Sequence, residues 1–145
     1  MKKIVLIGAG SAVFGLGTIN DIFQSESLVG STIVLHDINE NSLKIIAEAA
    51  EKFRSEHNLN FIIKPVSDRR EALKDADFCV ISIEVGHRFD LWDMDWKILQ
   101  QYGISQVYGE NGGLGGLFHS PGIIPLILEI CQMIVDIAPD ATVFN

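Results

Sequence analysis

The first fifteen residues, MKKIVLIGAGSAVFG (Met1–Gly15), decide the fold class. A short apolar run, Ile4–Ile7, is followed directly by Gly8 and Gly10. A continuous run of this length rich in β-branched residues is typical of a strand buried on both faces of a parallel sheet. Glycines between such a strand and a helix begin a G-x-G-x-x-G fingerprint, whose third position holds Val13 in this chain. The stretch predicts a nucleotide-binding βα turn, and a plain βα turn with glycines for geometry alone is the alternative.

Length and composition are those of one globular domain. The 145 residues are 48% hydrophobic and 21% charged, with a net charge of -8. No basic stripe is present to neutralise phosphates, which argues against nucleic acid or an anionic membrane as a partner. The apolar run before Gly8 is too short for a signal peptide, and we expect no stretch to approach a membrane span. A cytoplasmic protein is predicted, with Cys79 and Cys131 as buried free thiols.

Strand-length apolar runs alternate with helical patterns along the chain. We expect strands over 4–7, 32–35, 61–63, 78–83 and 142–144, and helices over 11–24, from 39–41 to at least 50, and over 68–73, 91–101 and 121–137. This order predicts an α/β fold, a doubly wound, Rossmann-like parallel sheet with helices on both faces. Residues 1–145 then form one nucleotide-binding domain. Because the chain stops at the end of a predicted strand, where such folds usually place functional residues, we expect it to be truncated or to be a domain of a longer protein.

Asp37 is the second candidate for cofactor binding. It ends the predicted strand 32–35 at the place where dinucleotide-binding folds use an acid to accept the ribose hydroxyls. A carboxylate there repels a 2′-phosphate, which favours NAD over NADP. An aspartate that begins a turn is the alternative. Ser82 and Ile83 end the strand 78–83 and should face the cofactor, although a satisfied strand-end hydroxyl explains Ser82 equally well.

No metal site is expected within the chain. Asp90, Asp93 and Asp95 lack the glycine and the distal acid of a calcium loop, so a solvated helix face is the better interpretation. The four histidines show no ligand spacing. The glycine-dense stretch Tyr108–His119 predicts a loop that exposes Glu110 and Asn111 toward a substrate, the alternative being a loop without function.

Taken together, these motifs resemble the N-terminal domain of the NAD- and manganese-dependent glycosidases of glycoside hydrolase family 4. The resemblance covers essentially the whole chain and rests on Gly8–Phe14, Asp37–Asn39, Ala76–Ile81, Gly109–Gly116 and Pro139–Asn145. The first motif is shared with malate and lactate dehydrogenases, and its combination with the Glu110 loop is more specific. The family is similar to this sequence in using Gly-x-Gly-Ser without a third glycine.

The resemblance implies an unusual hydrolysis of an α-linked sugar or uronic acid. Such enzymes oxidise the sugar C3 hydroxyl with NAD, which acidifies the C2 hydrogen. A base removes that proton, the aglycone is eliminated, water adds, and the hydride returns, with a divalent metal polarising the oxygen. Phosphorylated sugars are less expected, because His87-Arg88 is the one cationic pair predicted near the cleft. The resemblance also implies a homo-oligomer.

The resemblance assigns roles to individual residues. Those expected to bind the cofactor are Gly8, Gly10, Ser11, Ala12, Val13, Phe14, Asp37, Ile38, Ser82, Ile83 and Asn145, and those expected to bind substrate are Glu110, Asn111 and Arg88. The family's Asn-Pro motif, metal ligands and catalytic base lie beyond Asn145, so this chain alone is expected to be inactive. A hydroxy-acid dehydrogenase domain and a stand-alone nucleotide-binding module are the alternatives.

Overall fold

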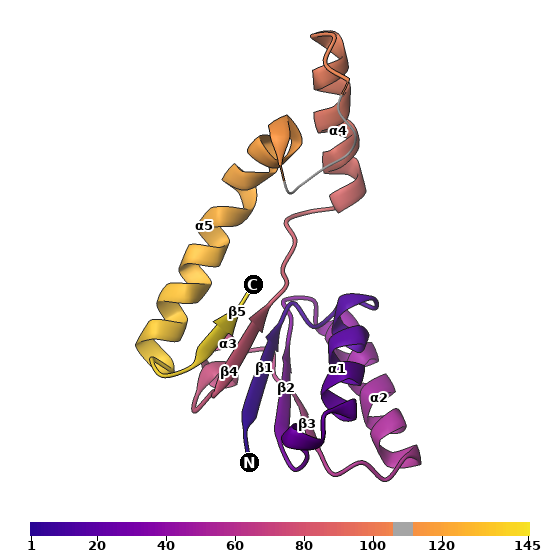
Figure 1. Ribbon diagram of the computed structural model, residues 1–145, viewed down its shortest axis with the longest axis vertical. Helices are drawn as coiled ribbons and strands as arrows, with labels where there is room; N and C mark the ends of the chain where they lie inside the picture. The colour runs from indigo at the N-terminus through magenta and orange to yellow at the C-terminus, as the bar shows by residue number, and fades with distance from the viewer. Residues whose placement is uncertain (106–111) are drawn as a thin grey trace. The chain divides into compact units, whose positions relative to one another are not determined.

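The computed structural model describes residues 1–105 and 112–145. These residues form two compact units, one of Met1–Ser82 with Gln132–Asn145 and the other of Ile83–Cys131 (Figure 1). The first unit holds the sheet, and the second holds one complete helix and most of another. The assignment of residues 1–145 to a single domain stays a prediction.

The first unit is built on one parallel sheet. Its strands are β1 (Lys3–Ile7), β2 (Thr32–His36), β3 (Ile62–Pro65), β4 (Phe78–Ile81) and β5 (Thr142–Phe144). All pairings are parallel, and the strand order is β3-β2-β1-β4-β5. The order runs outward from β1 in both directions, so the topological switch point lies between β1 and β4. This is the predicted α/β, Rossmann-like sheet, and the prediction is confirmed.

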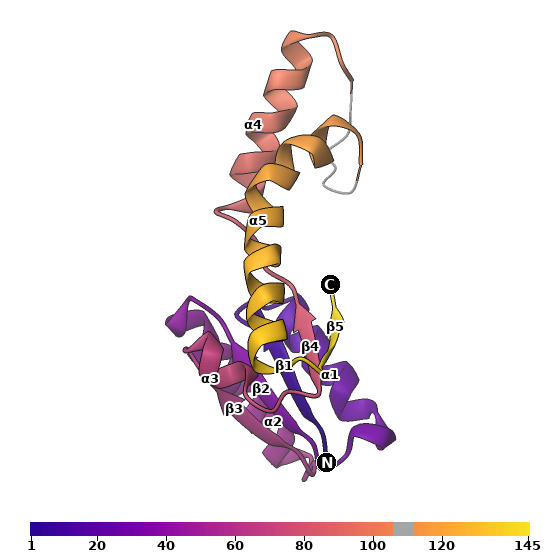
Figure 2. The same cartoon turned by 90° about the vertical axis from the view of Figure 1, so that its left-hand side faces the viewer.

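Helices cover both faces of the sheet. On one face α1 (Phe14–Gln24) and α2 (Glu40–Glu56) lie side by side (Figure 1), on the side of the sheet that is turned away from the viewer in Figure 2. Their apolar residues pack on those strand residues that point to the same side, and the buried cluster comprises Ile4, Leu6, Ile19, Ile22, Phe23, Ile33, Leu35, Leu43, Ile46, Ala47, Ala50 and Phe61, with Ala9. On the opposite face the short helix α3 (Arg69–Leu73) follows β3 and buries Ala72 and Leu73 completely.

The starts of α2 and α3 are set by side-chain caps. The Asn39 side chain accepts a hydrogen bond from the Ser42 N–H, at 3.0 Å. The Asp68 carboxylate accepts one from the Glu71 N–H, at 2.7 Å. A short 3-10 helix, η1 (Glu26–Leu28), connects α1 to β2.

Two helices reach beyond their predicted bounds. Helix α4 (Arg88–Gln101) begins at Arg88 rather than at residue 91. Helix α5 (Gly113–Ile137) begins at Gly113 rather than at Pro121, so part of the glycine-dense stretch is helix and the prediction of a loop there is wrong. Pro121 was expected as a first helical residue, but a proline inside a helix removes only one N–H and bends the helix without having to begin it.

The full length of α5 changes another expectation. Among the described residues, α5 is the one helix long and apolar enough to cross a membrane by length and composition, with a mean hydropathy of 1.6 over its most apolar window. The prediction that no stretch approaches a membrane span is therefore wrong by that measure, because the predicted helix was too short. Core helices of larger proteins have the same properties, since a helix that is apolar all round is normally covered.

Smaller differences concern strand ends and thiols. Helix α1 begins at Phe14 instead of Ser11, and β4 ends at Ile81, before Ser82 and Ile83. Cys79 is buried in β4, whereas Cys131 is half-buried. Burial raises the pKa of the Cys79 thiol to about 11, so this thiol is chemically inert at neutral pH.

Candidate functional site

The glycine loop leaves β1 at the centre of the sheet. Gly8 has a φ of 89°, a left-handed conformation that glycine adopts without strain. The N–H groups of Gly8 and Ala9 both donate to the carbonyl oxygen of His36, at 2.9 and 3.0 Å. Since His36 ends β2, these two bonds fix the loop against the carboxyl end of the neighbouring strand.

Asp37 is bound directly to the glycine loop. Its Oδ2 accepts a hydrogen bond from the Gly10 N–H at 2.7 Å, and its Oδ1 accepts one from the Asn39 N–H at 2.8 Å. A Cβ at Gly10 would lie 2.7 Å from that Oδ2, so any larger residue would separate the loop from the acid. A carboxylate has about four acceptor positions, and two bonds leave capacity for hydroxyl groups. The sequence therefore brings its two strongest motifs into contact, as the fingerprint predicts.

Gly15 performs the packing task of the missing third glycine. Val13, at the third fingerprint position, is the N-cap of α1 and is 88% exposed. Gly15 is buried, and a Cβ there would lie 2.2 Å from the carbonyl oxygen of Ala9. Close approach of helix and strand thus occurs two residues later than in the usual fingerprint. Sequence reasoning missed Gly15, although its place in the first turn after the loop was a visible signal.

The start of α1 presents an exposed surface beside Asp37. The Ser11 hydroxyl accepts a hydrogen bond from the Phe14 N–H at 3.1 Å, but the N-cap residue of α1 is Val13, whose side chain makes no capping bond. The residues from Ser11 to Phe14 are all exposed. Ile38, directly after the acid, is 84% exposed. Exposed apolar side chains at both edges of the loop are what a bound nucleotide would cover.

His36 is a buried polar residue below the acid. It is 2% exposed, and its Nδ1 lies 3.0 Å from the carbonyl oxygen of Val66, with the guanidinium of Arg69 3.5 Å from its Nε2. Burial lowers the pKa of His36 below its ordinary value, against the raising effect of the Val66 carbonyl, and Arg69 lowers it further. A neutral ring that donates from Nδ1 to Val66 fits these contacts.

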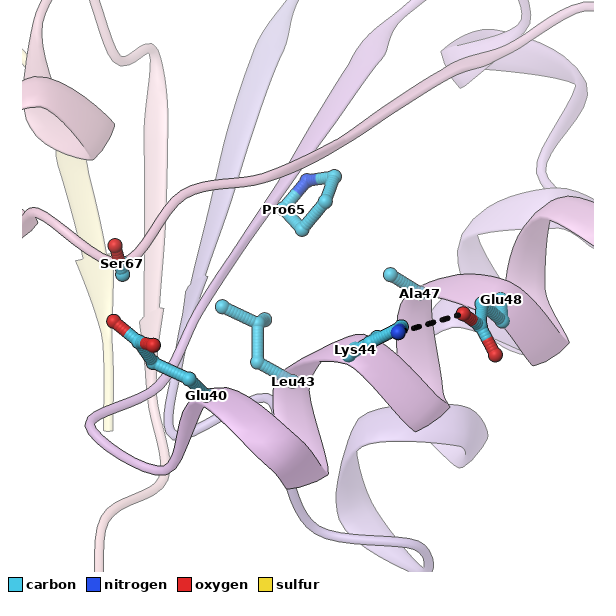
Figure 3. Close-up of a pocket in the computed structure, with 7 residues that line it drawn as sticks. All are labelled: Glu40, Leu43, Lys44, Ala47, Glu48, Pro65 and Ser67. Atoms are coloured by element: carbon cyan, nitrogen blue, oxygen red, sulfur yellow. Dashed lines mark ion pairs between the residues drawn. The ribbon is translucent and has the colours of Figure 1, made fainter.

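A hollow lies on another part of the first unit. It has a volume of about 400 Å³ between α2 and the end of β3, as Figure 3 shows, and is lined by Glu40, Leu43, Lys44, Ala47, Glu48, Pro65 and Ser67. Lys44 and Glu48 form an ion pair across 3.9 Å on its rim. None of the predicted site residues lines it. We assign it no role in cofactor binding.

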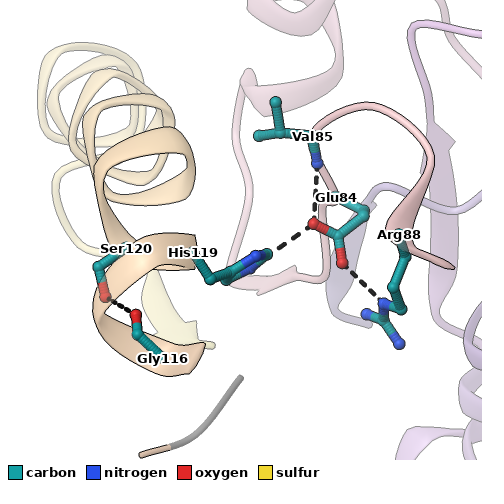
Figure 4. Close-up of polar contacts among 6 residues, drawn as sticks. All are labelled: Glu84, Val85, Arg88, Gly116, His119 and Ser120. Carbon is teal, nitrogen blue, oxygen red and sulfur yellow. Dashed lines mark hydrogen bonds and ion pairs between the residues drawn. The ribbon is translucent and has the colours of Figure 1, made fainter. Parts of the chain in front are cut away.

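The second unit contains a cluster of three charged or titratable side chains around Glu84 (Figure 4). One carboxylate oxygen of Glu84 accepts a hydrogen bond from the Arg88 Nε at 2.7 Å. The other accepts one from the Val85 N–H at 2.9 Å and lies 3.6 Å from the Nε2 of His119. Burial acts to raise the pKa of Glu84, but the bonds from Arg88 and Val85 and the charge of His119 outweigh it, so the pKa is lowered.

The remaining predicted residues have varied positions. Ser82 continues the sheet, because its N–H donates to the carbonyl oxygen of Ile7 at 2.9 Å, and Asn145 is exposed beyond β5. Arg88 binds Glu84, and its guanidinium lies 5.4 Å from the centre of the Trp92 ring. Glu110 and Asn111 lie outside the described residues.

The described residues do not fit a metal. No group of three His, Cys, Asp or Glu side chains within residues 1–105 and 112–145 is arranged to hold one. The glycine loop and Asp37, in contrast, fit a dinucleotide, since Gly10 keeps open the space between loop and acid that a Cβ would fill.

Comparison with known proteins gives consistent results. Over 143 residues the chain is 61% identical to an alpha-glucosidase of Erwinia rhapontici, covering 99% of this chain and 32% of that protein. It is 32% identical to an alpha-galactosidase of Bacillus subtilis, covering 100% of this chain and 34% of the relative. A 6-phospho-beta glucosidase of Thermotoga maritima, solved with manganese, NAD+ and glucose-6-phosphate, shares the fold with a TM-score of 0.84 at 19% identity, over 99% of this chain and 33% of that one.

The chain thus spans about a third of the length of the proteins it matches. A family model described as family 4 glycosyl hydrolase matches residues 3–145. The chain belongs to glycosyl hydrolase family 4.

Proposed function

We propose that residues 1–145 are the NAD-binding N-terminal domain of a longer, NAD- and metal-dependent glycosidase. This domain binds the cofactor. The whole enzyme cleaves an α-linked glycoside by oxidation at C3, elimination, water addition and reduction. The bond of 2.7 Å between Asp37 and the Gly10 N–H, beside the topological switch point, carries the proposal. The alpha-glucosidase relative, 61% identical, supports the reaction class.

Each part of the dinucleotide has candidate residues. The glycine loop and the start of α1 hold the pyrophosphate through backbone N–H groups and the helix dipole, with Gly8, Gly10, Ser11, Ala12, Val13 and Phe14. Asp37 accepts the ribose hydroxyls and Ile38 covers the adenosine. Ser82, Ile83 and Asn145 follow β4 and β5 and line the nicotinamide end. When bound, NAD supplies the acceptor and donor of a hydride.

The substrate and the remaining machinery are assigned more coarsely. Glu110, Asn111 and Arg88 bind the sugar. The metal ligands and the catalytic base belong to the part of the enzyme that follows, so residues 1–145 alone are inactive. A cytoplasmic location and a homo-oligomeric enzyme without nucleic acid or membrane partners complete the proposal. A hydroxy-acid dehydrogenase domain has less support, because the family model that matches residues 3–145 is that of the glycosidases. The same match leaves a stand-alone nucleotide-binding module with less support.

Calorimetric titration with NAD and NADP tests the cofactor assignment. We expect NAD to bind more tightly, and Asp37→Ala to narrow the preference by about 1–2 kcal/mol, the value of a hydrogen bond to a charged group. Asp37 also holds the Gly10 N–H, so the substitution weakens both cofactors through the loop. The ratio of the NAD affinity to the NADP affinity is not changed by this common loss. A change in that ratio therefore measures the effect of the Asp37 charge beside the ribose.

Lys44→Ala serves as the control, because Lys44 lies on α2 beside the hollow and outside the predicted cofactor residues. It should leave the ratio unchanged. Equal binding of NAD and NADP by the unsubstituted protein would refute the role of Asp37, and binding of neither would refute the cofactor assignment.

A further inference from the structure

We propose that Glu84 determines substrate specificity and makes the enzyme select neutral glycosides over sugars that carry a phosphate or a carboxylate. The inference rests on the proposed function and narrows its substrate class. It follows from where Glu84 lies along the chain, from its pairing with Arg88, and from the way its carboxylate is held.

Glu84 follows the strand next to the switch point. Strand β4 ends at Ile81, three residues earlier, and pairs with β1, which carries the glycine loop. Three residues span at most about 11 Å, so covalent geometry keeps the Glu84 backbone near the carboxyl end of β4. In open α/β sheets, ligands bind outside the carboxyl ends of strands at the switch point. The chain itself therefore keeps the Glu84 backbone close to the carboxyl end of β4, the end of the sheet at which such folds bind ligands.

Glu84 neutralises the cation that an anionic substrate would need. Proteins recognise phosphates and carboxylates with arginines whose guanidinium charge faces the ligand. Arg88 belongs to the one cationic pair predicted near the cleft, and its Nε donates to Glu84 across 2.7 Å. The pair Glu84–Arg88 has no net charge.

The Glu84 carboxylate is fixed and partly shielded from water. The Val85 N–H and His119 contact one of its oxygens, and Arg88 binds the other. The side chains of Glu84 and His119 are only 22% and 15% exposed. Salt and water screen charges less at such positions, so the carboxylate cancels the charge of Arg88 effectively and an anionic substrate group gains no attraction from this guanidinium. A neutral sugar does not need that attraction.

Glu84 has a purely structural alternative, in which it only fastens the start of α4 through Arg88. The two roles differ in their consequences. If Glu84 only fastens α4, its replacement lowers the thermal stability and changes the activity toward all substrates by the same factor. If Glu84 determines specificity, its replacement changes the ratio of the kcat/KM values for charged and neutral substrates.

The test uses the full-length enzyme with NAD and manganese. The kcat/KM values are measured for p-nitrophenyl α-D-glucopyranoside and for its 6-phosphate, in the wild type and in Glu84→Gln, which keeps the shape of the side chain and removes its charge. We expect the wild type to prefer the unphosphorylated substrate. Glu84→Gln should shift the ratio at least about tenfold toward the phosphorylated one, as removal of a poorly screened charge implies. Glu84→Asp keeps the charge and should retain most of the preference.

Glu48→Gln is the matched control, because it removes the same charge from the exposed surface of α2. It should leave the ratio within about twofold of the wild type, since exposed charges are largely screened. A wild type that prefers the 6-phosphate would overturn the inference. So would a Glu84→Gln enzyme with a lower melting temperature and an unchanged ratio. A wild type that hydrolyses neither substrate would overturn the proposed function and, with it, the specificity assigned to Glu84.

Discussion

Gly15 shows that the packing role of a motif can move along the chain. The residue that must lack a side chain is the one facing the Ala9 carbonyl, and α1 begins late enough that this residue is Gly15 and not residue 13. Val13 is then free to project into solvent. The fingerprint is therefore satisfied in three dimensions although it is incomplete as a sequence pattern.

Gly15→Ala is expected to destabilise the protein by about 1–3 kcal/mol, as overpacking usually does. Its Cβ would lie 2.2 Å from a backbone oxygen, which forces α1 away from the glycine loop. NAD affinity should fall as well, because the loop moves with the helix. Urea denaturation and calorimetric titration measure the two effects.

Gly17→Ala is the matched control for this substitution. Gly17 lies in the same helix, and a Cβ added there would meet nothing within 4 Å, so the new methyl group enters open space. Alanine there should stabilise the protein by about 0.5–1 kcal/mol through its higher helix propensity. Equal effects of the two substitutions would mean that Gly15 has no special packing role.

At the level of elements, the start of α2 links local structure to the candidate site. Asn39 caps the helix through the Ser42 N–H, and its own N–H donates to Asp37. The apolar residues of α2 that follow at helical spacing hold the helix on the sheet. The cap thus fixes both the helix and one side of the ribose-binding acid.

Asn39→Ala should cost about 1 kcal/mol of unfolding free energy, the usual value for the loss of an N-cap. Asn41→Ala, at an exposed position in the first turn of the same helix, should change stability far less. Both are measured by urea denaturation. If Asn41→Ala lowered the unfolding free energy as much as Asn39→Ala does, the Asn39 side chain would not be acting as the cap.

Helix α5 illustrates the opposite case, in which an element is not determined by local signals. Two prolines and several glycines within Gly113–Ile137 suggest a loop and a late start, yet the helix continues through them. The Ser120 hydroxyl donates to the Gly116 carbonyl at 2.6 Å inside this segment. Apolar side chains around the whole helix favour a covered element over an exposed loop.

At the scale of the whole molecule, His36 couples stability to pH. Its pKa is lowered in the folded protein, where Arg69, Asp37 and Asp68 are the charged groups around it. As pH falls through the ordinary histidine pKa near 6.5, the unfolded chain binds a proton that the folded protein does not. The contribution of His36 to the unfolding free energy is therefore fully present above pH 6.5, and it is lost as the pH falls toward the pKa that His36 has in the folded protein.

We expect the unfolding free energy to decrease between pH 7.5 and pH 5.5, and His36→Asn to reduce that decrease. Urea denaturation at several pH values measures the unfolding free energy of both proteins. His57→Asn, at the exposed C-cap of α2, is the control and should leave the pH dependence as in the wild type. An unchanged slope in His36→Asn would show that His36 is not its source.

The sequence predicted most of the fold because the signals are local. Alternating strand and helix patterns located every strand of the sheet to within a few residues. Gly10 and Asp37, which the sequence assigned to the same cofactor, are in contact at the carboxyl ends of β1 and β2. Helix boundaries were predicted less well. The preference of Ser11 and Pro121 for helix starts competes with tertiary packing, which cannot be read from the sequence. The roles of the predicted site residues remain predictions.

The sequence by itself determined the parallel sheet, the glycine loop and the acid after β2, because strand order and turn chemistry depend on neighbours along the chain. Only the tertiary structure decided that Gly15 replaces the third glycine, that His36 is buried against Val66, and that Glu84 meets His119. The last two contacts join residues far apart in sequence. Their formation depends on how helices and strands pack, and no local pattern encodes that packing.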